Sequence, residues 1–139
     1  MTSPITYLSK RYSFSASHRL YTDSLSFKEN QQIFGKCANP NGHGHNYYLT
    51  VTLKNAIDPS SGFAFPLESL DSIVFKEVLN IYDHQYLNID VEDYFKCVPT
   101  GENIALKIWE RLNPSLSDLL WTVTLDETRN NHFVYPTRT

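Results

Sequence analysis

The sequence predicts an α+β fold, a four-stranded antiparallel sheet with two helices on one face. Two long stretches, residues 5–20 and 46–57, alternate apolar and polar side chains, as half-buried strands do. Two stretches with apolar residues at helical spacing follow, and two short alternating stretches end the chain. Antiparallel hairpins combined with helices on one face are typical of the α+β class.

The two long strands are predicted from strict alternation. One side of the first strand carries Tyr12, Phe14, Ala16 and His18, and the other side carries serines. In the second strand, the apolar side carries Tyr47, Leu49, Val51 and Leu53. The turn-forming residues 58–62 then predict a hairpin connection to a short returning strand at 63–65, which Pro66 would stop.

Three helices are predicted between the strands, the first of them short. Ser26-Phe27-Lys28-Glu29 matches a capping box and indicates a short helix up to Phe34. A longer helix is indicated by apolar residues at helical spacing: Leu67, Leu70, Ile73, Val74, Val78 and Ile81. Residues 100–113 form the last helix, for which Thr100 is the expected N-cap and Pro114 marks the exit.

Residues 121–126 and 132–135 are predicted to form the last two strands, joined by a turn at 128–131. A sheet this small leaves two edges with unpaired backbone groups. Such edges invite pairing with other subunits.

Composition limits the class of protein. A chain of 139 residues without a linker or a repeat is expected to be one domain, 1–139. The net charge of −3 argues against a nucleic-acid partner, and no apolar run has the length of a membrane span. Residues 1–7 lack the layout of a signal peptide, and two cysteines are too few for a disulfide scaffold. A cytoplasmic location is therefore expected.

His43-Gly44-His45 is the strongest indication of chemistry. On an extended backbone the two imidazoles point to the same side, and His18 at the end of another strand adds a third. Three imidazoles and one open position are typical of a catalytic zinc site. The alternative is that each histidine is an ordinary core or surface residue, and His132 is interpreted in that way.

Cys37 lies six residues before His43, in a polar loop. A thiol near a zinc ion and a cation would have a lowered pKa and would be able to act as a base. The alternative is a buried apolar filler, the commonest role of a free cysteine and the one that Val98-Pro99 favours for Cys97. Asp83-His84 is open to two interpretations, an ordinary helix exit or a proton relay.

Taken in order, several motifs resemble the 6-pyruvoyl-tetrahydropterin synthase family over nearly the whole chain. They are FSASHRL at 14–20, FGKC at 34–37, NPNGHGHNY at 39–47, DH at 83–84, TGEN at 100–103 and ET at 127–128. The resemblance implies the tunnelling fold, in which three subunits close their sheets into a barrel and two barrels stack into a homohexamer. Active sites would lie at subunit interfaces.

The resemblance also implies roles for the site residues. His18, His43 and His45 would bind Zn²⁺. Cys37 would be the general base, with Asp83 and His84 completing its proton relay. Glu127 would anchor the pterin through two hydrogen bonds, and Thr100 and Glu102 would help line the pocket.

The implied reaction converts 7,8-dihydroneopterin triphosphate to 6-pyruvoyl-tetrahydropterin with elimination of triphosphate, in tetrahydrobiopterin biosynthesis. Two departures concern substrate fit. Gly101 stands where the family usually has Ser or Thr, and Pro66 where it usually has Asn or Asp. Backbone N–H groups at the helix start could serve in place of the missing hydroxyl.

Three alternatives stay open at this point. One is the sibling 6-carboxytetrahydropterin synthase, whose cysteine usually lies closer to the histidine pair than Cys37 does. Another is a three-histidine zinc hydratase or hydrolase that does not depend on this thiol. The third is a non-catalytic binding module in which Cys37 would be the fourth zinc ligand.

Overall fold

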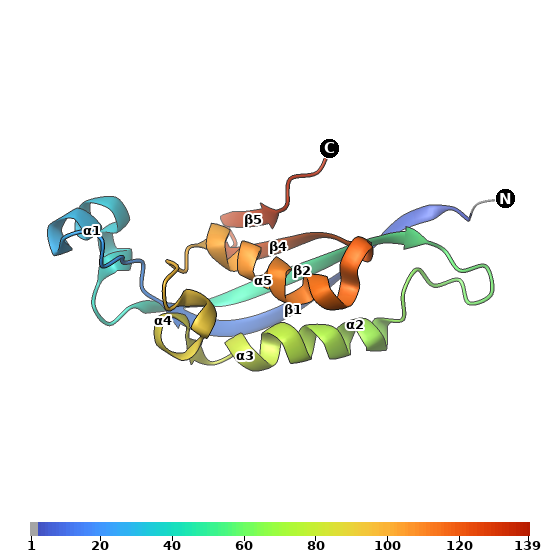
Figure 1. Cartoon of the computed structure of the whole chain (residues 1–139), viewed down its shortest axis with the longest axis horizontal. Coiled ribbons are helices and arrows are strands. Elements are labelled where there is room, and N and C mark those ends of the chain that lie inside the picture. The colour runs from blue at the N-terminus through green and yellow to red at the C-terminus, as the bar shows by residue number, and fades with distance from the viewer. Residues whose placement is uncertain (1–2) are drawn as a thin grey trace.

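A mixed five-stranded sheet, with helices across one face, organises the computed structural model, which describes residues 3–139 (Figure 1). The strand order is β3-β1-β2-β4-β5. The strands are β1 (Ile5–His18), β2 (His43–Ala56), β3 (Gln85–Tyr86), β4 (Leu120–Thr128) and β5 (Asn131–Tyr135). Met1 and Thr2 lie outside the described residues. They belong to the predicted domain 1–139 and to the segment inspected for a signal peptide.

The four antiparallel strands predicted from alternation correspond to β1, β2, β4 and β5, but the sheet has a fifth strand. β3 pairs in parallel with β1, with Gln85 opposite Ala16 and Tyr86 opposite Ser17. Two residues are too few to produce a periodic pattern, which is why the sequence did not reveal this strand.

The predicted returning strand at 63–65 is wrong, because these residues pair with no strand. Instead, Asp58 and Phe63 close a loop through a backbone hydrogen bond of 2.9 Å, and the Asn55 side chain binds the Ala64 carbonyl. Local hydrogen bonds therefore satisfy the backbone that a strand would otherwise pair.

The predicted helices are present with different ends, and a short helix at Leu87–Asp90 was not predicted. They are α1 (Phe27–Phe34), α2 (Leu67–Val74), α3 (Asn80–Tyr82), α4 (Leu87–Asp90) and α5 (Gly101–Leu116). Both hydrogen bonds of the predicted capping box are present at α1. A π-helical turn, Phe75–Leu79, joins α2 to α3, and 3-10 turns cover Gly35–Ala38, Glu92–Tyr94 and Ser117–Leu119.

Pro114 does not end the last helix as predicted, since α5 continues to Leu116. A proline in the last turn removes a single backbone hydrogen bond, and the buried Leu116 side chain anchors that turn in the core. Thr100 is the N-cap, as predicted, and accepts a hydrogen bond from the Asn103 N–H.

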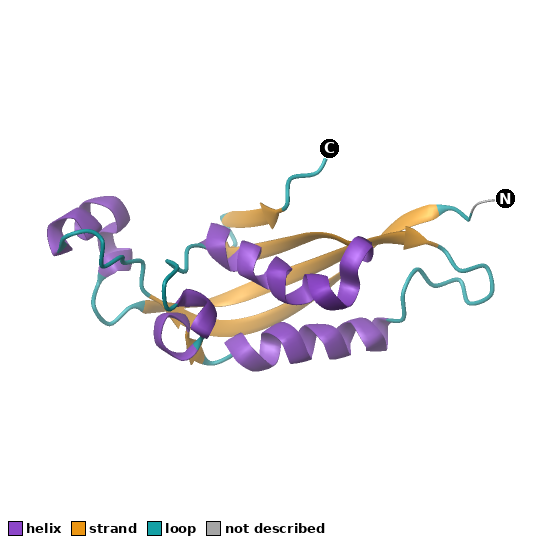
Figure 2. Ribbon diagram, in the orientation of Figure 1, coloured by secondary structure: helices purple, strands orange, loops and turns teal. Residues whose placement is uncertain are grey.

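The helices α2 and α5 cover one face of the sheet (Figure 2). Between them lies a core of fully buried side chains, among them Leu49, Leu53, Leu70, Ile104 and Ile108. The apolar sides predicted for both long strands face this core. None of the described helices has the length and apolar character needed to cross a membrane.

Candidate metal centre and surrounding site

The sheet register brings the three histidines together. β1 ends at His18 and β2 begins at His43, and these two residues are direct partners in the antiparallel ladder. His45 lies two residues along β2, opposite Ala16, so its side chain lies on the same face. One ring nitrogen from each histidine lies within 4.8 Å of the other two. This group could hold a metal ion.

The His18 ring is held in one orientation. It is 1 % exposed, and its Nδ1 lies 2.7 Å from the carbonyl oxygen of Pro99. A carbonyl can only accept, so Nδ1 carries the proton and Nε2 presents its lone pair. That Nε2 lies 3.1 Å from Nε2 of His43. Burial lowers the pKa of His18 to about 4, so the ring is neutral at pH 7.

His45 supplies independent support for a missing ligand. Its Nε2 is buried and has no hydrogen-bond partner among the described residues. Burial also lowers the pKa of His45, which keeps this ring neutral. Buried polar atoms are rarely left without a partner, and a neutral imidazole nitrogen aimed at two others is a typical metal donor. The donor set therefore fits a metal ion with three protein ligands.

Glu127 is the acidic group beside the three histidines. The β4–β5 register shifts between Asp126 and Thr128, which makes Glu127 the extra residue of a β-bulge. Its Oε2 lies 4.0 Å from Nε2 of His18, and its side chain is 17 % exposed. The Asn131 side chain donates to the other carboxylate oxygen at 3.4 Å. The bulge thus supports an acceptor next to the metal-binding group.

Cys37 lies in the 3-10 turn Gly35–Ala38, and its carbonyl accepts a hydrogen bond from the Leu20 N–H at 2.8 Å. This bond ties the loop to the residues after His18. The sulfur does not belong to the group of ligand atoms within 4.8 Å. Burial, and then the Glu127 carboxylate, raise the pKa of the Cys37 thiol. Both effects disfavour the thiolate, so the expected lowering of this pKa depends on a bound metal cation and stays a prediction.

Asp83 and His84 form a pair at the end of α3. Asp83 Oδ2 lies 3.0 Å from His84 Nδ1, and Asp83 Oδ1 accepts from the Ser15 N–H at 2.8 Å. That backbone hydrogen bond lowers the pKa of Asp83, which is therefore a carboxylate. His84 has a left-handed backbone with φ 62°, and its N–H donates to the Ser15 carbonyl. These bonds attach the pair to the edge of β1.

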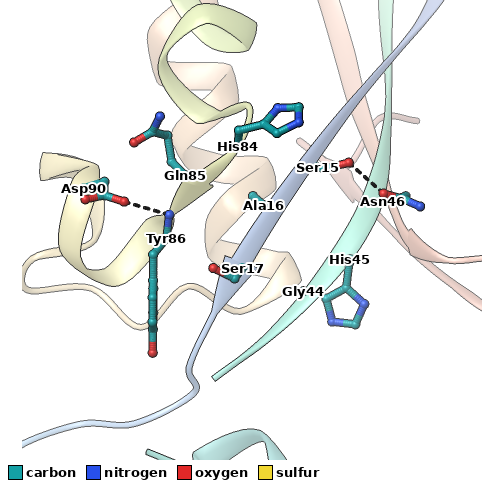
Figure 3. Close-up of a pocket in the computed structure, with 10 residues that line it drawn as sticks. All are labelled: Ser15, Ala16, Ser17, Gly44, His45, Asn46, His84, Gln85, Tyr86 and Asp90. Atoms are coloured by element: carbon teal, nitrogen blue, oxygen red, sulfur yellow. Dashed lines mark hydrogen bonds between the residues drawn. The ribbon is translucent and has the colours of Figure 1, made fainter. Parts of the chain in front are cut away.

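The structure does not join this pair to Cys37. No hydrogen bond or ion pair connects them within residues 3–139, and the His84 side chain is 81 % exposed. His84 and His45 instead line one open cavity of about 560 Å³. Figure 3 shows that they approach it from different elements, His84 from the segment after α3 and His45 from β2.

The remaining predicted site residues lie at the start of α5. Thr100 caps the helix directly after Pro99, the residue that holds His18, and Glu102 is exposed in the first turn. The Pro99 carbonyl is a site group that sequence reasoning missed, because a backbone oxygen leaves no residue-type signal.

His132 and Cys97 were predicted to have no part in the site, and Pro66 was a departure from the family pattern. His132 is exposed in β5, opposite Asp126, as expected of a solvated histidine. Cys97 is half-buried, and its thiol donates a weak hydrogen bond to the neighbouring Val98 carbonyl, with an S–O distance of 3.9 Å. Pro66 precedes α2 as an N-cap without a side-chain hydrogen bond.

Comparison with known proteins gives a consistent result. The family described as "6-pyruvoyl tetrahydropterin synthase" matches residues 7–138. The chain is 45 % identical over 129 residues to a Homo sapiens "6-pyruvoyl tetrahydrobiopterin synthase", covering 92 % of this chain and 89 % of that protein. The corresponding Dictyostelium discoideum protein is 44 % identical, with 92 % and 93 % covered. The solved structure of Caenorhabditis elegans 6-pyruvoyl tetrahydropterin synthase superposes with a TM-score of 0.94 at 41 % identity, over 99 % of each chain.

Proposed function

The chain belongs to the 6-pyruvoyl tetrahydropterin synthase family, as an enzyme, and we propose that it is a zinc-dependent lyase acting on 7,8-dihydroneopterin triphosphate. The product would be 6-pyruvoyl-tetrahydropterin, formed with elimination of triphosphate, and the step would belong to tetrahydrobiopterin biosynthesis. Oxidation and reduction are internal to the substrate side chain, so no redox cofactor is required.

The observation that carries the proposal is the group formed by His18, His43 and His45. Three imidazole nitrogens lie within 4.8 Å of one another, and one of them is buried with no partner among the described residues, which matches a metal with an open coordination position. We propose that the metal is Zn²⁺. When bound, it would supply positive charge opposite the negative charge that develops on the side-chain oxygens of the substrate.

Cys37 is proposed as the general base. Its sulfur lies outside the set of metal-ligand atoms, so it stays available to accept a carbon-bound proton at Sγ. Burial and Glu127 oppose ionisation of the thiol, so the base form would depend on the metal charge nearby. The group of possible ligand atoms contains only the three histidines, so it does not support a four-ligand structural site that includes this sulfur.

Asp83 and His84 are proposed to exchange the proton with Cys37. Because Asp83 engages Nδ1 of His84, the outward-facing Nε2 is the nitrogen able to take or return a proton. The exposed position of His84, without a bond to Cys37 in this chain, supports an active site completed at a subunit interface.

Glu127 is proposed to anchor the pterin, a small-molecule substrate, through hydrogen bonds from its pyrimidine N–H groups. Its carboxylate lies beside His18, so the ring and the metal-bound side chain of the substrate would lie together. Thr100 and Glu102 flank the same end of α5 and are proposed to line the pocket.

We propose that the enzyme is a cytoplasmic homohexamer, a dimer of trimers, whose sheets close a barrel between subunits. The edge strands β3 and β5 have unpaired backbone groups that a neighbouring subunit could pair. The free thiols of Cys37 and Cys97 suit a reducing compartment.

Product analysis tests the proposal. The purified protein, with its metal identified by mass spectrometry, is incubated with 7,8-dihydroneopterin triphosphate and the pterin products are separated. We expect 6-pyruvoyl-tetrahydropterin and inorganic triphosphate. Acetaldehyde together with 6-carboxytetrahydropterin would identify the sibling activity instead, and unchanged substrate would refute both.

A further inference from the structure

The Phe133 ring occupies the space that a side chain at position 101 would need. A Cβ built at Gly101 would lie 2.5 Å from Cζ of the Phe133 ring and closer still to Cδ2 and Cε2. Carbon atoms do not approach this closely, so any side chain at position 101 would displace the ring. Gly101 is itself fully covered although it has no side chain. The ring therefore fills the volume that a larger residue would take.

This pair lies beside the groups proposed to bind the pterin, and the inference rests on that proposed function. Phe133 is the cross-strand partner of Leu125, and Glu127 lies two residues further along β4. Across from the strand, Thr100 and Glu102 flank Gly101 in the first turn of α5. The ring thus lies between the Glu127 strand and the capped end of the helix.

Phe133 is packed against the core and is only partly buried. One part of the residue is therefore covered by the protein, and the remaining part is accessible to solvent. An aromatic ring at the edge of a site suits a planar heteroaromatic ligand, because stacked and edge-to-face contacts between rings are both favourable.

We infer that Phe133, admitted by the absence of a side chain at Gly101, forms an apolar wall of the pterin site and determines how tightly the bicyclic ring binds. In a chain with a hydroxyl residue at position 101, the same wall would offer a polar contact. In this chain an aromatic contact from Phe133 on β5 would take the place of the polar contact from α5. The contact is to the ring system and away from the side chain that reacts.

Steady-state kinetics on 7,8-dihydroneopterin triphosphate test the inference with four variants: Phe133→Val, Gly101→Ala, which adds no hydroxyl, the double variant, and Phe63→Val as a control. Phe63 is 61 % exposed in the loop after β2, so its replacement should change nothing. We expect Phe133→Val to raise KM by roughly three- to tenfold, the size of one lost aromatic contact, with kcat within about twofold.

The double variant separates binding from packing. Gly101→Ala alone should lower the thermal midpoint, because the new methyl group overlaps the ring. Adding Phe133→Val makes room, so the midpoint should recover. We expect KM to stay high in the double variant. Recovery of KM together with the midpoint, or an unchanged KM in Phe133→Val, would reduce Phe133 to a packing residue and overturn the inference.

A binding titration keeps this result distinct from the proposed activity. Quenching of protein fluorescence by 7,8-dihydroneopterin, which lacks the triphosphate, reports ring binding without turnover. If the wild-type protein binds this pterin but forms no product, the proposed reaction fails while the weaker binding of Phe133→Val can still be measured. Equal pterin affinity in the wild type and Phe133→Val, or no affinity in either, refutes the inference.

Discussion

The carbonyl oxygen of Pro99 lies 2.7 Å from Nδ1 of His18, and this contact assigns the proton of the ring. Nε2 is then the donor atom that faces His43 and His45. A hydrogen bond to the second nitrogen of a metal-ligating histidine orients the ring and increases its basicity. The residue before the helix N-cap Thr100 therefore orients His18, a proposed metal ligand on a strand far away in the sequence.

The first prediction concerns the metal. His45→Gln removes a proposed ligand nitrogen that has no hydrogen-bond partner within residues 3–139, so the metal content of the purified protein should fall from about one per chain to near zero. Elemental analysis by mass spectrometry measures this. The matched control is His132→Gln, an exposed histidine on β5, which should keep the full content. Full metal content in His45→Gln would show that this ring is not a ligand.

The variant Cys37→Ser tests whether Cys37 acts as a general base or as a metal ligand. Because the sulfur is outside the metal-binding group, the metal content should be unchanged, while kcat falls at least about a hundredfold for want of an effective proton acceptor. Turnover and metal content are measured on the same preparation. Cys97→Ser, the other half-buried thiol, should behave as wild type. Loss of metal from Cys37→Ser would instead indicate a structural site with a sulfur ligand.

Glu127→Gln keeps the shape of the side chain and removes its charge. An amide can accept only on one side, so one of the two hydrogen bonds to the pterin is lost. We expect KM to rise by roughly tenfold or more, in line with the loss of a charge-assisted bond. Glu102→Gln, on the exposed first turn of α5, provides a comparison with a smaller effect. An unchanged KM in Glu127→Gln would place the pterin elsewhere.

Acid should destabilise the metal-free protein through His18. Burial lowers the pKa of His18 from 6.5 to about 4, so between these values the unfolded chain binds more protons than the folded one. Stability is therefore present above pH 6.5 and is lost as the pH falls toward 4, by roughly 3 kcal/mol from this group.

Urea unfolding at several pH values, with a chelator present, measures this loss. The slope of stability against pH should be shallower in His18→Gln than in the wild type, whereas His132→Gln should keep the wild-type slope. Identical slopes in the wild type and His18→Gln would mean that His18 is not held neutral by burial.

A separate group of hydrogen-bonded side chains should stabilise the 3-10 turn Glu92–Tyr94, which follows α4. The Arg111 guanidinium donates hydrogen bonds to both carboxylate oxygens of Asp93, and the Tyr82 hydroxyl donates to Asp93 at 2.7 Å. Burial raises the pKa of Asp93, but the bonds from Arg111 and Tyr82 outweigh it and hold this pKa below its usual value. Arg111→Met would leave a half-buried carboxylate without its cation and should cost about 2–3 kcal/mol in urea unfolding.

The double variant Asp93→Asn, Arg111→Met provides the control for this network. It should lose less stability than the sum of the single variants, because no uncompensated charge remains. Strict additivity would show that the two side chains contribute independently.

Local sequence was sufficient for much of the fold. Alternation placed β1 and β2 and identified Tyr47, Leu49, Val51 and Leu53 as core residues, because a strand with one buried face must alternate. The Ser26 and Thr100 caps followed from residue type, because hydroxyls at those positions satisfy the first free N–H groups of a helix. The two-residue β3 and the loop at 63–65 did not follow, because each depends on hydrogen bonds to distant or irregular backbone.

The same division applies to the site. Spacing placed His43 and His45 on one side of a strand, and motif resemblance indicated the family. Only the tertiary structure decided that His18 is the cross-strand partner of His43, that the Pro99 carbonyl orients it, and that Phe133 fills the space above Gly101. Residue types and local periodicity specify which chemistry is available, whereas strand register and helix packing between distant segments determine which atoms meet.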